Sequence, residues 1–347
     1  MLRTGFTTGT AAAAATKAAA VLIIHNAALR DVDVPLPKGG RLVVPVASAW
    51  KLPDGAEAVV IKDGGDDPDA THGAHIHAQV RLDEGGEVHI HGGPGVGQVT
   101  RPGLILPVGE AAINPVPRQQ ITAALREVLP HGGAHITISV EDGEAIAQKT
   151  LNPRLGIVGG ISILGTRGTV RPFSHGAYRA TIRTEMAMAR AAGVREVLLT
   201  TGGRSETFFR HHHPEPWTAI QVADHVAFAL RQAAHQGMVR VHWALFLGKL
   251  IKQAQGMPCT HARFGGLDME RLQHLAQDVG IDLPLHLAPT ALAAEQMLSS
   301  HPKAQSLYLR LMEEAARHAW AFARVPFHLG YTLFNFQGDI LATWRSP

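Results

Sequence analysis

Apolar positions change their spacing near residue 193, and this change divides the chain into two parts. The first part opens on an alanine-rich run over 11–24, which predicts a helix that ends at Asn26 and has Thr10 as its N-cap. Further helices are predicted over 121–129 and 174–192, and strands over 31–35, 41–46, 56–61 and 135–140, with two more around 75–77 and 89–91. This mixture predicts an α+β domain with an antiparallel or mixed sheet over residues 1–192.

Strands and helices alternate in the second part, residues 193–347. The predicted strands cover 196–200, 239–244 and 283–287, a hairpin covers 331–344, and the predicted helices cover 217–236, 249–255, 268–279, 290–300 and 306–323. Alternation of this kind predicts an α/β domain whose parallel sheet binds ligands at the carboxyl ends of its strands. Gly202 and Gly203 form a turn at such an end, whereas the histidines at 211–213 are interpreted as a solvated loop.

Composition narrows the classes of function. A chain of 347 residues with 46% hydrophobic residues is long enough for two globular cores, and we expect no membrane span, no signal peptide and a cytoplasmic location. The single cysteine, Cys259, excludes an internal disulfide, and without a Cys-x-x-Cys pair no structural zinc site is expected. The 32 basic and 29 acidic residues give a net charge of only +3, so nucleic acid is not expected as a partner, and a small polycarboxylate or phosphate suits the chain better.

Five glycines lie between positions 152 and 170, at Gly156, Gly159, Gly160, Gly165 and Gly168. The stretch is not a phosphate loop, because Thr166 follows Gly165 where that loop needs a lysine, and it does not fit the dinucleotide fingerprint. Two interpretations stay open: the backbone amides bind an anionic group, or the glycines form a buried, tightly turning crossing. Threonines at the start of the first helix form a second predicted anion site.

Carboxylates crowd into positions 63–69, beside Thr71 and His72. Such a cluster indicates a solvated turn, contacts to a ligand, or base catalysis by a carboxylate whose pKa is raised by repulsion from its neighbours. Four histidines, at 75, 77, 89 and 91, indicate a metal site or, as we prefer, an exposed strip.

Several long blocks together resemble one family. LRTGFTTGT, KDGGDDPDATHG, GGPGVGQVTRPGL, KTLNPRLGIVGGISILGTRGTV and GKLIKQAQG are similar to the cobalt-precorrin-5B C1-methyltransferase family of anaerobic cobalamin biosynthesis, almost continuously over the first 175 residues. The resemblance implies an α+β first domain followed by an α/β Rossmann-like second domain. It also implies methyl transfer from S-adenosyl-L-methionine to a cobalt-containing tetrapyrrole.

Site residues follow from the resemblance and from the patterns above. The expected cofactor-binding residues are Gly202, Gly203, Gly248, Lys249, Thr260 and His261. The expected substrate-binding residues are Thr7, Thr8, Thr10, Lys62, Asp63, Gly159, Gly160, Ser162, Gly165 and Thr166. Asp66, Asp67 and His72 are the candidates for moving a proton on the macrocycle, with no metal ion held by the protein. Assembly into a homo-oligomer is left open.

The second domain departs from the family pattern. Ala223, Asp224 and His225 stand where the family has Ser-Asn-Phe, and Leu245 and Phe246 replace its Gly-His. A second hypothesis is therefore a related protein that binds or chaperones a tetrapyrrole without methylating it.

Overall fold

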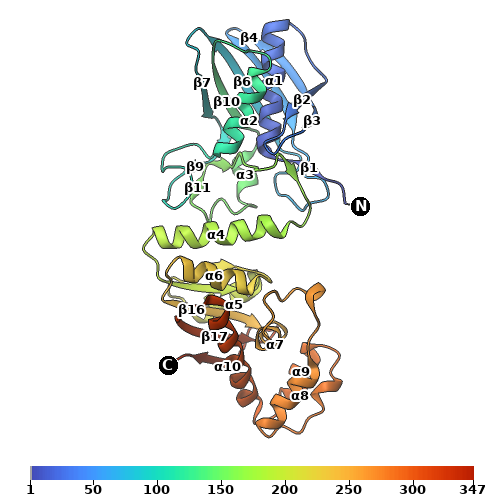
Figure 1. The fold of residues 1–347 in the computed structure, drawn as a ribbon, viewed down its shortest axis with the longest axis vertical. Coiled ribbons are helices and arrows are strands. Elements are labelled where there is room, and N and C mark those ends of the chain that lie inside the picture. The colour runs from blue at the N-terminus through green and yellow to red at the C-terminus, as the bar shows by residue number, and fades with distance from the viewer. Residues whose placement is uncertain (1) are drawn as a thin grey trace. The chain divides into compact units, whose positions relative to one another are not determined.

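The computed structural model describes residues 2–347, and contacts between them divide the chain into two compact units. The first unit ends at His175 and the second begins at Gly176 (Figure 1). We expected the boundary near Gly193, but helix α4 (His175–Ala191) inserts Ile182, Met186 and Ala189 into the core of the second unit. The position at which the chain divides follows from this burial.

A mixed five-stranded sheet forms the first unit, in the order β4-β5-β6-β10-β7. All neighbours are antiparallel except β7 and β10, which are parallel, so of the two predicted arrangements, antiparallel or mixed, the sheet is the mixed one. Its strands are β4 (Ser48–Leu52), β5 (Gly55–Ile61), β6 (His75–Asp83), β7 (Val88–Gly92) and β10 (Gly133–Val140). A hairpin of β2 (Asp31–Pro35) and β3 (Arg41–Pro45) accompanies it.

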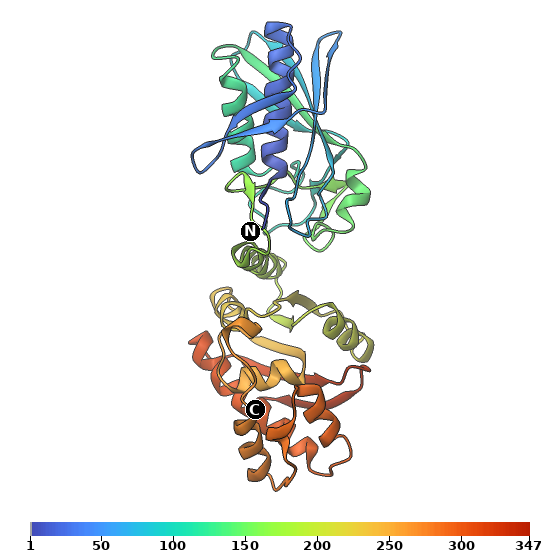
Figure 2. The same cartoon turned by 90° about the vertical axis from the view of Figure 1, so that its right-hand side faces the viewer.

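Helix α1 (Thr8–His25) runs beside α2 (Pro115–Arg126) and packs on β5 and β6 (Figure 2). Its alanines are fully buried, because a side chain of one methyl group lets two backbones approach closely. Among residues 2–347, α1 is the one helix long and apolar enough to cross a membrane, but 78% of its apolar stretch is buried, which makes α1 a core helix.

The second unit is built on a five-stranded sheet in the order β15-β14-β16-β17-β18. Neighbours among the first four strands are parallel, and β18 closes the edge in an antiparallel hairpin with β17. The strands are β14 (Glu196–Thr200), β15 (Thr218–Gln221), β16 (Arg240–Phe246), β17 (His328–Phe334) and β18 (Ile340–Arg345). The chain passes from β14 to one side for β15 and then to the other side for β16. The strand order therefore reverses at β14, and ligands of such sheets bind beside that reversal.

Helices join these strands. They are α5 (Gly203–His212), α6 (Val226–His235), α7 (Leu247–Ala254), α8 (Met269–Asp278), α9 (Ala291–Leu298) and α10 (Ala304–Ala323). Side chains of α4, α6, α7 and α10 belong to the large core cluster, whereas α5 packs against the other face of the sheet through Phe209.

Several predicted elements in the first unit were wrong in detail. Helix α1 is capped by Thr7, whose side chain accepts from the Thr10 amide, so Thr10 lies inside the helix. Helix α2 begins at Pro115, because the fixed φ of proline suits a first helical turn, and the proline-rich sequence concealed this start.

Larger corrections concern the second unit. The predicted helix over 217–236 is strand β15 followed by α6, because pairing with β14 outweighs helix propensity and Ala223, at φ 46°, breaks the segment. The histidines at 211–213 lie in or directly after α5 rather than in a loop, and the predicted strand over 283–287 contains the 3-10 turn Leu285–Leu287.

Candidate functional site

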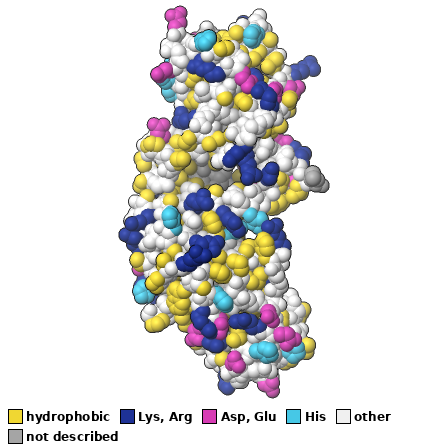
Figure 3. Space-filling view, viewed as in Figure 1, with side chains coloured by type: hydrophobic (Ala, Val, Ile, Leu, Met, Phe, Trp, Pro, Cys, Tyr) yellow, Lys and Arg dark blue, Asp and Glu magenta, His cyan; other side chains and the backbone are white. Residues whose placement is uncertain are grey.

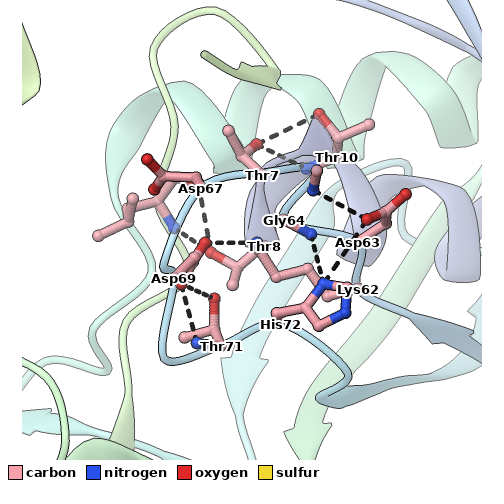
Figure 4. A network of polar contacts seen from close by, with 12 residues as sticks. Thr7, Thr8, Thr10, Lys62, Asp63, Gly64, Asp67, Asp69, Thr71 and His72 are labelled. Atoms are coloured by element: carbon pink, nitrogen blue, oxygen red, sulfur yellow. Dashed lines mark hydrogen bonds and ion pairs between the residues drawn. The ribbon is translucent and has the colours of Figure 1, made fainter. Parts of the chain in front are cut away.

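The loop over 62–72 in the first unit gathers much of the predicted polar chemistry (Figure 4). Lys62, directly after β5, is only 2% exposed, and its Nζ lies 2.5 Å from Asp69 Oδ2. Asp69 also accepts from the amide and hydroxyl of Thr71. Burial raises the pKa of Asp69, but the Lys62 ammonium and the Thr71 bonds outweigh burial and lower it overall. Lys62 therefore serves as the counter-ion that holds this loop closed.

The other carboxylates of the loop are structural acceptors. Asp63 receives the Arg3 guanidinium and the Gly65 amide, and the bonds from Arg3 hold its pKa below the usual range. Asp66 accepts from the Arg3 amide at 2.6 Å, and Asp67 accepts from the Phe173 amide at 2.8 Å. The expected raised carboxylate pKa is therefore wrong for Asp63 and Asp69, because each faces a cation instead of another carboxylate.

His72 differs from these carboxylates because its side chain is 56% exposed. Its Nδ1 accepts from the Gly64 amide at 3.0 Å and lies 3.6 Å from Asp63 Oδ1. An accepting Nδ1 leaves the proton of the neutral ring on Nε2. His72 can thus present a proton to a ligand while its other nitrogen is held in place.

The threonines at the start of α1 bind the glycine stretch. The Thr8 hydroxyl donates to the Ser162 carbonyl at 3.0 Å, and the Thr10 hydroxyl donates to the Gly168 carbonyl at 2.7 Å. Thr7, Thr8 and Thr10 are all buried. The hydroxyls of Thr8 and Thr10 fix the path of the backbone over 162–168, so they are engaged within the fold where the sequence indicated an anion site.

Glycine is needed at Gly160, Gly165 and Gly168 for close packing. A Cβ at Gly160 would lie 2.1 Å from the Gly95 carbonyl oxygen, one at Gly165 would lie 2.4–2.6 Å from Thr7, and one at Gly168 would meet Leu36. The buried-crossing interpretation therefore holds for these three. Gly159, at φ 84°, is different, because a Cβ there would meet no described atom within 4 Å.

Two further residues of this stretch complete the predicted substrate set. Ser162 is buried, and its hydroxyl donates to Asn152 Oδ1 at 3.1 Å while Asn152 donates to the Gly160 carbonyl at 2.8 Å. Thr166 is exposed. Among the predicted residues of this unit, Asp66, His72, Gly159 and Thr166 are exposed to a ligand, and Asp66 already accepts the Arg3 amide.

The expected exposed strip of four histidines holds for His89 and His91, whereas His75 and His77 are half-buried and lie against Glu141 and Glu57. His89, His91 and His135 stack with ring centroids 4.9–6.5 Å apart, and all three are exposed. Over residues 2–347 the structure holds no group of three side chains that could bind a metal ion.

In the second unit, the predicted cofactor residues lie at the carboxyl edge of the sheet. Gly202 and Gly203 follow β14, and a Cβ at Gly202 would meet no described atom within 4 Å, while one at Gly203 would meet only Gln221, at 3.9 Å. The hydroxyl of Thr200, the last residue of β14, is fully buried and has no hydrogen-bond partner among the described residues. The turn therefore leaves open space above its backbone and a polar group beneath it.

Asp224 joins residues that are far apart in the sequence. Its Oδ1 accepts from the Thr260 hydroxyl at 2.6 Å and contacts the Lys249 ammonium, so the structure brings two predicted cofactor residues together. Burial raises the pKa of Asp224, but the bonds from Lys249 and Thr260 outweigh it and the pKa is lowered. Sequence reasoning missed Asp224 as a site residue. Its distance of about twenty residues from the glycine turn was a usable signal, hidden because β15 was interpreted as helix.

Gly248 and His261 have mainly local roles in this geometry. A Cβ at Gly248 would lie 3.3 Å from Ala291 of α9, so packing accounts for this glycine. His261 caps a short turn by accepting from the Arg263 amide at 3.2 Å.

Basic side chains gather over α4. Arg179, Arg183 and Arg190 are exposed on this helix, and Figure 3 shows Lys and Arg side chains concentrated at its level. Arg179 and Arg183 lie 5.6 and 5.9 Å from the ring centroid of Phe228 on α6. This surface favours an anionic ligand.

Comparisons with known proteins address the family. The family model CbiD matches residues 1–172, and the model described as the CbiD C-terminal domain matches residues 259–345. A crystal structure of a cobalamin biosynthesis protein (cbiD) from Archaeoglobus fulgidus is 30% identical, covers 81% of this chain and 85% of its own, and superposes with a TM-score of 0.41.

Curated relatives match most of the chain. A cobalt-precorrin-5B C(1)-methyltransferase of Nitratidesulfovibrio vulgaris is 46% identical over 99% of this chain and 92% of its own. Relatives of the same name from Geobacillus kaustophilus and Burkholderia lata are 50% and 45% identical, over 80% and 85% of this chain and 77% and 83% of their own. These matches confirm the resemblance seen in the sequence, and the chain belongs to the CbiD family, whose curated relatives are named cobalt-precorrin-5B C(1)-methyltransferase.

Proposed function

We propose that this chain transfers a methyl group from S-adenosyl-L-methionine to C1 of cobalt-precorrin-5B in anaerobic cobalamin biosynthesis. The observation that carries the proposal is identity of 46% along 99% of the chain to a relative of that name. The departures at Leu245 and Phe246 do not interrupt this similarity, which favours the enzyme over a protein that only binds a tetrapyrrole.

The residues of the second unit fit the methyl donor, and we propose this unit as a Rossmann-like donor domain. Gly202 and Gly203 leave space for a ligand to approach the backbone, and the Thr200 hydroxyl has hydrogen-bonding capacity left. Asp224 lies after β15, where an acidic group in comparable sheets receives ribose hydroxyls. Lys249 and Thr260 hold its carboxylate in place.

When bound, S-adenosyl-L-methionine supplies a methyl group on a sulfonium sulfur, which transfers directly to carbon. The protein needs no nucleophile for this step, so its main contribution is to hold donor and acceptor in line, which can supply about 7–11 kcal/mol. In the first unit, the ordered loop over 62–72 and the glycine stretch form the proposed substrate surface, with Gly159 and Thr166 as accessible contacts.

His72 is the proposed proton carrier of this surface. Its ring is exposed and oriented by the Gly64 amide, whereas Asp66 and Asp67 already accept backbone amides. Those two carboxylates therefore orient the loop, and the exposed Nε2–H of His72 is the group placed to donate a proton to the macrocycle as its carbon is methylated. We place the activity in the cytoplasm, where the proposed donor and substrate would meet.

Turnover tests the proposal. Purified protein incubated with cobalt-precorrin-5B and methyl-labelled S-adenosyl-L-methionine should yield a labelled product heavier by one methyl group. Binding of the macrocycle without a labelled product, and without binding of S-adenosylhomocysteine, would contradict the enzyme and restore the binding protein.

A further inference from the structure

An aromatic cluster lies where α5 meets the carboxyl ends of β16 and β17. The rings of Phe246 and Phe336 are stacked, with centroids 4.8 Å apart and planes inclined by 7°, and Phe208 meets Phe246 edge-on at 6.2 Å. The Arg204 guanidinium lies 5.1 Å from the Phe336 centroid, 5.7 Å from that of Phe246 and 5.8 Å from that of Phe208. Together these four side chains are called the Arg204 platform.

The Arg204 platform belongs to the carboxyl edge of the sheet. Phe246 is the last residue of β16, Phe336 lies two residues beyond β17, and Arg204 follows Gly203 in the first turn of α5. Arg204 Nη2 also donates to the Phe336 carbonyl at 2.7 Å, so the platform has a fixed geometry. Arg204 joins the platform to the open glycine turn, because it follows Gly203 directly in the chain.

The platform residues could serve only to hold the turn between β17 and β18, but that role does not explain why part of the platform is exposed. The Asn335 side chain already accepts from the amides of the next residues, including Gly338 at 2.8 Å, and His212 contacts the Gly338 carbonyl at 2.8 Å. Phe336 nevertheless keeps 39% of its surface exposed, and Arg204 is exposed as well. A flat, partly exposed pair of a phenyl ring and a guanidinium is a stacking surface for a planar ring.

We propose that the Arg204 platform binds the adenine base of the methyl donor by stacking on Phe336 and Arg204. This inference rests on the proposed function, because it assigns the base-binding part of the same donor site. Adenine is planar and uncharged, so both a phenyl face and a guanidinium plane can stack on it. The open glycine turn next to the platform leaves the rest of the adenosyl ligand close to the backbone.

Calorimetric titration of the full chain with S-adenosylhomocysteine and with adenosine tests the platform. Phe336→Leu should weaken both ligands by about tenfold or more, since one base stacked on an aromatic ring contributes a factor of that order. Phe336→Trp keeps a stacking face and should retain binding. Arg204→Gln, at an exposed position that should fold normally, should weaken both ligands in the same direction.

Phe322→Leu is the matched control. Phe322 is a partly exposed phenylalanine near the end of α10. This helix leads into the amino end of β17, whereas the platform lies at the carboxyl ends of the strands, so replacing Phe322 should leave both affinities unchanged. Unfolding temperatures of all variants separate lost binding from lost folding. Wild-type affinity in both Phe336→Leu and Arg204→Gln would overturn the platform and leave the proposed function standing. Failure of the wild-type chain to bind S-adenosylhomocysteine would overturn the donor assignment and the platform together.

Discussion

Lys62 was predicted to bind a ligand, but its side chain is required by the fold. Its ammonium is buried and meets Asp69, whose side chain keeps 22% exposure. A charge that leaves water in this way needs a partner of opposite sign. Sequence alone marked Lys62 and Asp63 as neighbours of a ligand, since it carried no information on burial.

Lys62→Met should lower the unfolding free energy of the first unit by about 2 kcal/mol, less than the ~3–5 kcal/mol of fully buried pairs, because water still reaches Asp69. The double variant Lys62→Met with Asp69→Asn should recover part of this loss. Urea denaturation measures both. Arg81→Met, which breaks the exposed pair with Asp54, is the control and should change the free energy by less than ~1 kcal/mol. Equal losses in Lys62→Met and Arg81→Met would contradict the buried-pair account.

His242 predicts a pH dependence for the second unit. Burial lowers the pKa of His242 to about 3, with smaller contributions from the positive charges of Arg345, His213 and Arg240. Its Nε2 also contacts the Thr332 hydroxyl at 2.8 Å. Because the unfolded chain has a histidine pKa of about 6.5, it binds a proton that the folded chain does not bind between that pH and about 3.

Stability of the second unit should therefore fall as the pH drops below about 6.5, by up to about 1.4 kcal/mol per pH unit from this residue. The decrease should level off near pH 3, where folded His242 also takes up a proton. Histidine NMR titration checks the cause directly, because the His242 ring should stay neutral at pH 5. A midpoint near 6.5 for that ring would contradict the prediction.

Glycines have different structural roles in the two units. In the first unit the glycine stretch packs against α1, and at Gly165 the backbone has φ 136° with Thr7 in the space a side chain would fill. In the second unit Gly203 opens α5 in ordinary helical backbone with free space above it. The first arrangement serves packing, and the second leaves room for a ligand.

Gly165→Ala should destabilise the first unit by about 2–3 kcal/mol, because the new methyl group clashes with Thr7 in a strained conformation. Gly159→Ala and Gly86→Ala share a similar positive φ and open surroundings, so each should lose only about 1 kcal/mol. Thermal unfolding measures stability and turnover measures function. Loss of activity in Gly159→Ala but not in Gly86→Ala would support a ligand at Gly159, and equal activity would remove Gly159 from the substrate surface.

Gly203→Val should abolish binding of S-adenosylhomocysteine while the protein keeps most of its stability. The valine side chain would occupy the open space, where Gln221 is the nearest described group, and valine is no poorer a helix former than the glycine it replaces. Calorimetry and thermal unfolding of the same sample test this. Unchanged binding would place the donor elsewhere.

The whole molecule carries two separate cores. One large cluster of buried residues lies in each unit, and the two clusters share no residue. Units with their own cores can unfold independently. Contacts within the chain divide the two units between His175 and Gly176.

Scanning calorimetry should therefore resolve two unfolding transitions. Lys62→Met should move only one of them, and lowering the pH from 6.5 to 4.5 should move the other through His242, in addition to any general acid effect. A single transition that both changes shift together would show that the units unfold as one.

Local sequence was sufficient wherever local chemistry decides structure. It determined the alanine helix, most strand positions, the α+β character of the first part, the α/β character of the second part and the family, because these depend on side-chain spacing and on long distinctive blocks. The glycine turn after β14 was predicted for the same reason.

Only the tertiary structure decided features that depend on distant partners. Strand β15 exists because β14 pairs with it, against the helical character of the sequence between 217 and 236. Asp224 became part of the site because Lys249 and Thr260 fold onto it, and the Arg204 platform combines residues from 204 to 336. Burial and pairing across such distances determine which charges are neutralised and which surfaces stay open, and spacing along a chain does not encode them.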